Sequence, residues 1–178
     1  MATAYATNGG SSASDVLVRD CEPRDLDVVH ALHVDAVLHT TAIWQDAPNP
    51  RSWFDTWLSD RRAAGLPVFV AEVDGEVAGY VTYGPFRPHD GYRHTVEHSV
   101  YVLPAFRGRG IASVLMRALV AHARQRDLHV MMAGICSANT GSIALHERLG
   151  FEVVAVLPEV GRKFDRWLDL TLMRLPLS

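Results

Sequence analysis

The sequence predicts one α+β domain with a mixed, mostly antiparallel central sheet flanked by helices. Its segments follow the order strand, two helices, three strands, helix, strand, helix and two strands. Two strand-like runs flank Asp74-Gly75, which favours a tight hairpin and therefore antiparallel pairing. The chain has 178 residues, 48% hydrophobic and 21% charged, which is enough to build a core without disulfides or metals.

The domain is expected to span residues 15–178. Residues 1–14 are mostly Ala, Thr, Gly and Ser and contain no apolar run. A secretory signal needs such a run, so this segment is interpreted as a disordered extension and not as a signal.

The first half alternates strand and helix signals. Pro23 suits the first turn of a helix, and Asn49-Pro50 marks the start of a second one. The second helix is expected to bury one face. That face consists of Trp53, Phe54, Trp57 and Leu58. In chain order we expect a strand at 16–18, the two helices, and hairpin strands at 68–71 and 77–81.

The second half begins with a loop at 85–92 and a long strand at 95–102. Apolar residues at helical spacing predict a helix over 110–126. The run 130–135 is almost continuously apolar, which predicts a strand covered on both faces. A short helix at 139–149 is expected to end at Gly150 in a left-handed conformation. Strands at 151–156 and 167–175 complete the sheet.

A glycine-rich turn connects the strand at 95–102 to the helix at 110–126. Gly108 and Gly110 allow close approach to backbone N–H groups at the helix start, where an anion is favoured. Arg107 and Arg109 add positive charge. The turn is therefore a candidate phosphate or pyrophosphate site, and the alternative is a tight turn that binds nothing.

Two nucleotide-binding motifs fit this turn poorly. A Walker A loop ends in Gly-Lys-Ser/Thr, which is absent. In a dinucleotide fingerprint Ser113 could supply the third small residue, but the acidic residue should end the next strand. Asp127 precedes that strand instead.

Composition and residue spacing argue against several other classes. A net charge of -3 carries no basic excess for general nucleic-acid binding, and no apolar stretch approaches the ~20 residues that span a membrane. Cys21 and Cys136 stand apart, which predicts neither a disulfide framework nor a zinc site and fits a cytoplasmic location. His30 and His33 lack further ligands in a metal pattern. We therefore expect no metal, no nucleic acid and no membrane among the partners.

Two segments together resemble the GNAT N-acetyltransferases. Arg107–Ala112 is similar to the acyl-CoA pyrophosphate loop of that superfamily, Arg/Gln-x-x-Gly-x-Gly/Ala. Asn139–Phe151 resembles its Asn-x-x-(Ala/Ser)-x-x-x-(Tyr/His)-x-x-x-Gly-Phe segment. Within the superfamily, three further segments resemble the phosphinothricin acetyltransferase branch, and most closely its enzymes that act on methionine sulfoximine and methionine sulfone. These are 36–44, 93–102 and 161–169.

The resemblance implies acetyl-CoA as co-substrate and a homodimer as the assembly. Main-chain groups of Val100 and Val102 would bond the pantetheine arm, the turn would hold the pyrophosphate, and Asn139 and Ser142 would bond the arm from the other side. The implied cofactor-binding residues are Val100, Tyr101, Val102, Arg107, Gly108, Arg109, Gly110, Ile111, Ala112, Ser113, Asn139 and Ser142.

Glu97 and His146 are the candidate catalytic residues. Glu97 lies on a strand between Val96 and Val100 and could remove a proton from an acceptor ammonium; the alternatives are an anchor for that ammonium or a surface carboxylate. Strand alternation places His94 and His98 on the opposite face from Glu97. His146 stands where many relatives carry Tyr and could protonate the leaving thiolate. Alternatively, it bonds the coenzyme arm or a neighbouring carbonyl.

The acceptor is expected to be a small anionic amine. Arg87 and Arg93 could bind a carboxylate and a phosphinate or sulfone oxygen, because Arg presents two parallel donors. Tyr92, Thr95 and Trp44 are candidate walls for the acceptor side chain. The predicted reaction is direct acetylation of the α-amino group of a small amino acid or analogue. The alternatives are another amine (a polyamine, an aminoglycoside or a protein N-terminus) or a non-catalytic CoA-binding sensor.

Overall fold

The computed structural model describes residues 16–178, so the extension expected at 1–14 lies outside the described residues. The described residues form two compact units. Unit 1 contains residues 16–33, 49–83 and 99–121, and unit 2 contains residues 34–48, 84–98 and 122–178. The boundary of one domain at 15–178 stays a prediction.

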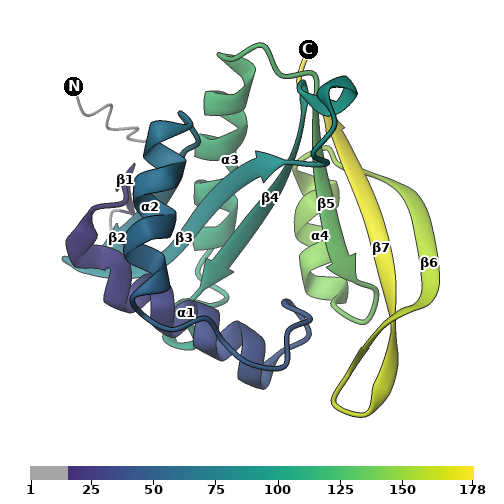
Figure 1. The fold of residues 1–178 in the computed structure, drawn as a ribbon, viewed down its shortest axis with the longest axis horizontal. Helices are drawn as coiled ribbons and strands as arrows, with labels where there is room; N and C mark the ends of the chain where they lie inside the picture. Colours follow the sequence, from purple (N-terminus) through teal and green to yellow (C-terminus); the bar gives the residue numbers. More distant parts are fainter. Residues whose placement is uncertain (1–15) are drawn as a thin grey trace. The chain divides into compact units, whose positions relative to one another are not determined.

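The sheet confirms the predicted fold class. Across residues 16–178 its seven strands are hydrogen-bonded in the order β1-β2-β3-β4-β5-β7-β6 (Figure 1). The strands β4 (Thr95–Val102) and β5 (Val130–Cys136) are parallel, whereas β1–β2, β2–β3, β5–β7 and β6–β7 are antiparallel. No helix in this part of the chain is long and apolar enough to cross a membrane.

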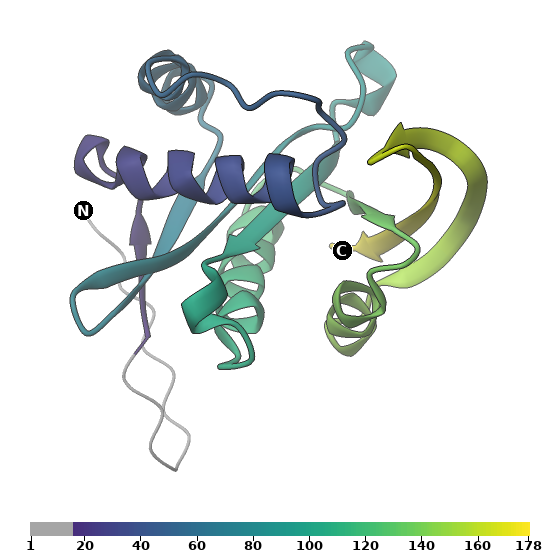
Figure 2. The ribbon, with the colours of Figure 1, turned by 90° about the horizontal axis from the view of Figure 1, so that it is seen from below.

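Unit 1 is built on β1 (Leu17–Asp20), β2 (Val68–Val73) and β3 (Glu76–Pro85), the last two joined by the expected turn at Asp74-Gly75. The helices α2 (Trp53–Ala63) and α3 (Ile111–Arg124) lie on opposite sides of β3 (Figure 2). Its buried core combines these elements with the first turns of α1 (Leu26–His39). The core residues include Leu26, Val29, Leu32, Phe54, Leu58, Val68, Val70 and Tyr80.

The expected buried face of α2 is only partly correct. Phe54 and Leu58 are buried, but Trp53 is 44% exposed. Trp53 instead lies against the Phe54 ring and alongside Trp57 at the surface. The helix also begins three residues after Pro50, because turn residues precede it.

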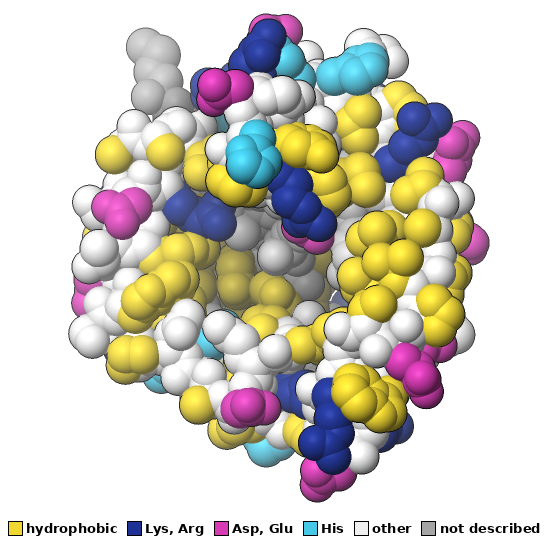
Figure 3. All heavy atoms as spheres, turned by 45° about the vertical axis from the view of Figure 1, so that its right-hand side comes forward, with side chains coloured by type: hydrophobic (Ala, Val, Ile, Leu, Met, Phe, Trp, Pro, Cys, Tyr) yellow, Lys and Arg dark blue, Asp and Glu magenta, His cyan; other side chains and the backbone are white. Residues whose placement is uncertain are grey.

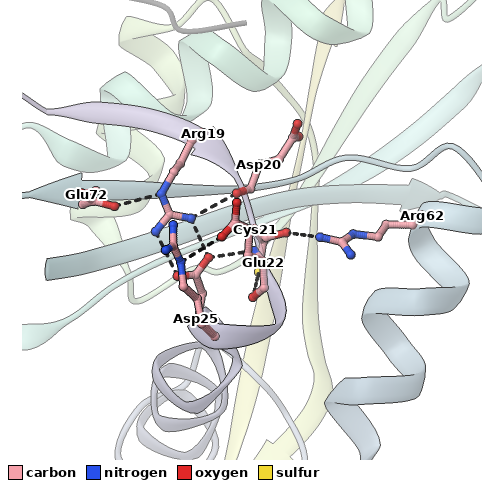
Figure 4. Close-up of polar contacts among 8 residues, drawn as sticks. Arg19, Asp20, Cys21, Glu22, Asp25, Arg62 and Glu72 are labelled. Atoms are coloured by element: carbon pink, nitrogen blue, oxygen red, sulfur yellow. Dashed lines mark hydrogen bonds and ion pairs between the residues drawn. The ribbon is translucent and has the colours of Figure 1, made fainter. Parts of the chain in front are cut away.

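An ion-pair network fixes the start of α1 through the short 3-10 helix η1 (Pro23–Asp25). Arg19 holds both Asp25 oxygens, at 2.6 and 2.9 Å, and its Nε donates to Glu72 at 2.9 Å (Figure 4). Burial disfavours the charged Asp25 carboxylate, but the hydrogen bonds from Arg19 and the Glu22 backbone, together with the positive charge of Arg19, outweigh it and keep the pKa of Asp25 below its usual value. Because every group in this network is bonded within it, we assign it a structural role.

Unit 2 contains the first residues of β4, all of β5, α4 (Thr140–Arg148) and a long hairpin. The hairpin strands are β6 (Glu152–Lys163) and β7 (Arg166–Pro176). β7 agrees with the predicted range to within one residue at each end, whereas β6 extends well beyond its predicted range. The β6–β7 pairing shifts register between Val153 and Ala155 and again between Leu157 and Gly161. These irregularities break the two-residue period on which the sequence prediction depends.

The prediction that β5 is covered on both faces is wrong. Met131, Ala133 and Ile135 are buried, but Met132 on the other face is half-buried and Gly134 is exposed. Glu97 from β4 faces this less covered side of β5. The apolar composition of β5 therefore hides a surface that carries a carboxylate.

Candidate active site

The centre of the candidate site is Glu97 on β4. Its neighbours Val96 and His98 are buried on one face, while Glu97 and Thr95 are half-buried on the other. Glu97 pairs with Met132 of β5 in the parallel ladder, and its carboxylate lies over Gly134, two residues further along. A Cβ on Gly134 would come within 3.0 Å of Glu97 Oε1. Only glycine at 134 leaves the carboxylate this room.

The environment of Glu97 suits a base. Desolvation by burial raises the pKa of its carboxyl, and the positive charge of Arg87 opposes that shift without cancelling it. A carboxylate with a raised pKa accepts protons more readily near neutral pH than an ordinary surface carboxylate. Gly134 was missed at the sequence level, although a glycine inside an apolar strand often marks a close approach.

The segment between β3 and β4 carries three of the predicted acceptor residues. Arg87 is exposed, with its guanidinium 4.1 Å above the Phe86 ring and Nη1 donating to Phe86 O at 2.9 Å. Arg93 is also exposed and donates to Asp90 O at 3.2 Å. Tyr92, 41% exposed, packs against the edge of Phe86. Both guanidinium groups keep further donors for an anion, since Arg carries five.

The other predicted acceptor residues also belong to unit 2. Thr95 accepts a backbone hydrogen bond from Phe86 through its carbonyl, at 3.1 Å, which ties the segment to β4. Trp44 follows α1, and its Nε1 donates to Thr41 O at 2.9 Å. All the residues predicted to meet the acceptor therefore lie in the unit that carries Glu97.

A buried histidine pair joins β4 to α4. His146 and His98 stack with their ring centroids 4.9 Å apart and their Nε2 atoms 3.0 Å apart. His146 Nδ1 also lies 2.6 Å from Ser142 O, a carbonyl that can only accept. We therefore assign the Nδ1 proton to His146, and His98 must then donate from Nε2. Burial lowers the pKa of both imidazoles, that of His98 to about 3, so both rings are neutral.

In this arrangement His146 bonds a neighbouring carbonyl, which was the alternative to a role as the acid that protonates the thiolate. Its side chain is buried, and both ring nitrogens are already engaged. Close by, Asn139 caps α4 by accepting from Ser142 N at 3.1 Å. Whether Asn139 and Ser142 bond a coenzyme arm stays a prediction.

The glycine-rich turn of unit 1 fits an anion site. Gly108 and Gly110 have φ values of 77° and 79°, a conformation that disfavours side chains, and the space where a Cβ would stand is open at both. α3 begins at Ile111, directly after them, with the unpaired N–H groups of its first turn. Arg107 donates from Nε to Val102 O at 3.1 Å, and Arg109 lies over the Phe106 ring.

The remaining predicted cofactor residues lie on either side of this turn. Ala112 and Ser113 are half-buried in the first turn of α3, and Ile111 is buried. Val100, Tyr101 and Val102 form the end of β4, where Tyr101 packs against Tyr80 with ring centroids 5.2 Å apart. Gly79 of β3 permits this packing, because a Cβ there would meet Tyr101 O at 2.5 Å.

Two histidines of α1 and both cysteines are bonded or buried. His30 and His33 contact the backbone of Asn49. Burial raises the pKa of Cys21 to about 12, and Cys136 is also buried. Within residues 16–178 no cluster of three His, Cys, Asp or Glu side chains could hold a metal ion.

Comparison with known proteins identifies the family. The pattern of the Acetyltransferase (GNAT) family matches residues 29–151. The chain belongs to this family. An L-methionine sulfoximine/L-methionine sulfone acetyltransferase from Pseudomonas aeruginosa is 50% identical over 166 residues, which are 90% of this chain and 94% of that protein.

Two further relatives are also acyltransferases by name. An L-amino acid N-acyltransferase from Escherichia coli is 46% identical over 165 residues, 90% of this chain and 94% of its own. A GNAT superfamily phosphinothricin acetyltransferase from Sinorhizobium meliloti, solved in complex with acetyl-CoA, is 34% identical. It superimposes with a TM-score of 0.89 over 92% of this chain and 89% of that chain. The fold is therefore the GNAT fold, and the protein is an acetyltransferase.

Proposed function

We propose that this GNAT acetyltransferase transfers the acetyl group of acetyl-CoA to the α-amino group of a small amino acid or analogue. Methionine sulfoximine, methionine sulfone and phosphinothricin are the acceptors we favour. The observation that carries the proposal is Glu97, a desolvated carboxylate held over Gly134 in the unit that also contains Arg87 and Arg93. The relatives named above support the same substrate class.

The proposed mechanism is direct attack of the acceptor nitrogen. Acetyl-CoA supplies the activated thioester. Glu97 takes a proton from the acceptor ammonium, which exposes the nitrogen lone pair for attack on the thioester carbon. The C–S bond breaks and CoA leaves as a thiolate, which needs little acid help because a free thiol has a pKa of only ~8.5. Arg87 and Arg93 bind the acceptor carboxylate and its phosphinate or sulfone oxygen. Both cysteines are buried, and the raised pKa of Cys21 removes its thiolate, so neither suits an acyl-enzyme intermediate.

We assign the coenzyme to the glycine-rich turn, the start of α3 and the end of β4. The open left-handed glycines and the start of α3 fit a pyrophosphate, and Arg107 and Arg109 add charge beside them. The end of β4 offers backbone groups for an extended arm. We assign His146 a supporting role, because its neutral ring has no free N–H to give to a thiolate once Ser142 and His98 are bonded.

We also propose a homodimer in the cytoplasm. The β6–β7 hairpin carries several exposed apolar side chains. They are Val153, Val154, Val156, Leu157, Val160, Phe164 and Trp167. Figure 3 shows hydrophobic side chains (yellow) gathered on the right-hand side of this view. β6 also ends the strand order, so a second copy could cover both an apolar surface and a sheet edge. The two free cysteines fit a reducing compartment.

A substrate panel tests the proposed function. The purified protein is mixed with acetyl-CoA and each candidate amine, and release of the CoA thiol is measured. We expect turnover with methionine sulfone, methionine sulfoximine or phosphinothricin, and far less with spermidine, an aminoglycoside or a peptide N-terminus. Turnover only with the second group would replace the acceptor class. Binding of acetyl-CoA without turnover of any amine would favour the non-catalytic sensor.

A further inference from the structure

Lys163 is the one lysine of the chain, and it is almost completely buried. The sequence contains 17 Lys and Arg residues, and every other one is Arg. Lys163 is only 6% exposed, although lysine is rarely buried to this extent without partners. It is the last residue of β6, far from Glu97 in sequence.

The Lys163 ammonium binds the end of α1 and the segment that follows it. Nζ donates to Thr40 O at 2.8 Å, to Ile43 O, and to Ala36 O at 3.5 Å. Three carbonyls thus match the three N–H groups of the ammonium. The last carbonyls of a helix have no partner within it, and a cation at that end is favoured by the helix dipole. A compact ammonium meets these converging carbonyls better than a planar guanidinium.

Gly161 holds the same segment from two residues earlier on β6. A Cβ at Gly161 would overlap the Trp44 ring, so the absence of a side chain allows the indole to pack on the strand. Residues two apart on a strand share a face, which places Gly161 and Lys163 on the same side of β6. Together with the bond from Trp44 Nε1 to Thr41 O, these contacts fix the indole in one position.

We propose that Lys163 is a positioning residue for acceptor binding, acting through residues 40–44 and the Trp44 ring. This inference rests on the proposed function and on the prediction from the sequence that Trp44 forms a wall for the acceptor side chain. Lys163 does not itself touch the acceptor; its ammonium is enclosed by the three carbonyls and the Phe164 ring, 4.9 Å away. Loss of the ammonium releases Trp44 and weakens acceptor recognition, while the glycine-rich turn in unit 1 is unchanged.

The test compares Lys163→Met with Arg162→Met. Methionine keeps most of the length of lysine without the charge, and Arg162 is the adjacent exposed cation, paired with Asp165. Lys163→Met should raise the acceptor KM about tenfold or more and leave the acetyl-CoA KM within about twofold. Arg162→Met should change neither. Equal changes in both KM values, or none, would overturn the proposal.

Two further measurements separate positioning from loss of structure. On a Trp44→Ala background, Lys163→Met should add little to the acceptor KM, because coupled residues are not additive. Independent, additive effects would contradict the proposal.

Fluorescence tests the anchoring without any activity. The emission of Trp44 is obtained by subtracting the spectrum of the matching Trp44→Phe protein. It should shift to longer wavelength in Lys163→Met and stay unchanged in Arg162→Met. If it shifts while no amine is acetylated, the proposed function fails and the anchoring stands. An unshifted Trp44 spectrum in Lys163→Met would show that Lys163 does not fix the Trp44 ring, whatever the activity.

Discussion

His98 Nε2 lies 3.0 Å from His146 Nε2, and this contact joins β4 to α4 inside unit 2. With the His146 proton committed to Ser142 O, the proton between the rings belongs to His98. His98 Nδ1 is then a buried lone pair, and it has no hydrogen-bond partner among residues 16–178. Protonation of that nitrogen would place a charge in a site with no counterion, which explains the direction of the shift in its pKa.

The first prediction is that buried His98 makes the free energy of unfolding depend on pH. Burial lowers the folded-state pKa of His98 from 6.5 to about 3, so between these values the unfolded chain binds more protons. The stability that comes from a neutral His98 is therefore fully present above about pH 6.5 and is lost as the pH falls. His98→Gln keeps a donor for His146 but does not titrate. As the pH falls from about 5.5 to about 4.5, the free energy of unfolding should fall by about 1.4 kcal/mol more in wild type than in the variant.

Urea unfolding of the two proteins across about pH 4.5 to 7.5 measures this difference. The contribution of His33, whose pKa is also lowered, is common to both and cancels. Parallel stability curves would show that His98 does not carry the pH dependence.

The second prediction concerns the glycine-rich turn. Gly110→Val forces a β-branched residue into a φ of 79°, at the turn whose N–H groups we propose to bind the pyrophosphate. Acetyl-CoA affinity should fall more than about tenfold, or about 1.4 kcal/mol. Isothermal titration calorimetry measures the affinity directly.

Gly65→Val is the matched control for backbone strain. Gly65 has a similar φ of 67° and open space around it, but it lies after α2 and away from the turn. Both variants should lose stability by a similar amount, roughly 1–3 kcal/mol. Only Gly110→Val should lose affinity. Equal acetyl-CoA affinity in the two variants would remove the turn from the cofactor site.

How much the sequence reveals depends on whether the signal is local. The limits of β4 and the left-handed Gly150 (φ 90°) are predicted well, because alternation and a helix-ending glycine are local patterns. The length of β6 is missed because Glu159 with φ 51° and two register shifts interrupt its period. Lys163 is missed for another reason: its carbonyl partners lie 120 or more residues away in sequence.

A third prediction follows from the room that Gly134 leaves. Gly134→Ala places a methyl group 3.0 Å from Glu97 Oε1, while its contacts with Leu170 and Leu172 are ordinary ones of 3.6 and 3.9 Å. The carboxylate must therefore move, and the core need not. We expect kcat to fall about tenfold or more with little change in melting temperature. Steady-state rates and a thermal melt decide the matter; an unchanged kcat would mean that the position of Glu97 is not critical.

The last prediction tests Glu97 itself. Glu97→Gln keeps the shape of the side chain over Gly134 and removes the basic oxygen. If Glu97 is the base, kcat should fall about 10²- to 10⁴-fold, with acetyl-CoA affinity nearly unchanged, because the residue acts on the acceptor. Since the pKa of Glu97 is raised by burial, the wild-type rate should decline as the pH falls toward that pKa, and the variant should lack this limb. At high pH the variant should recover part of its rate, because solvent then deprotonates the amine.

If Glu97 only anchors the ammonium, the acceptor KM should rise with a smaller loss of kcat. Rates measured for both proteins from about pH 5.5 to 9.5 distinguish these outcomes. Equal kcat and KM values over that range would exclude Glu97 from the mechanism.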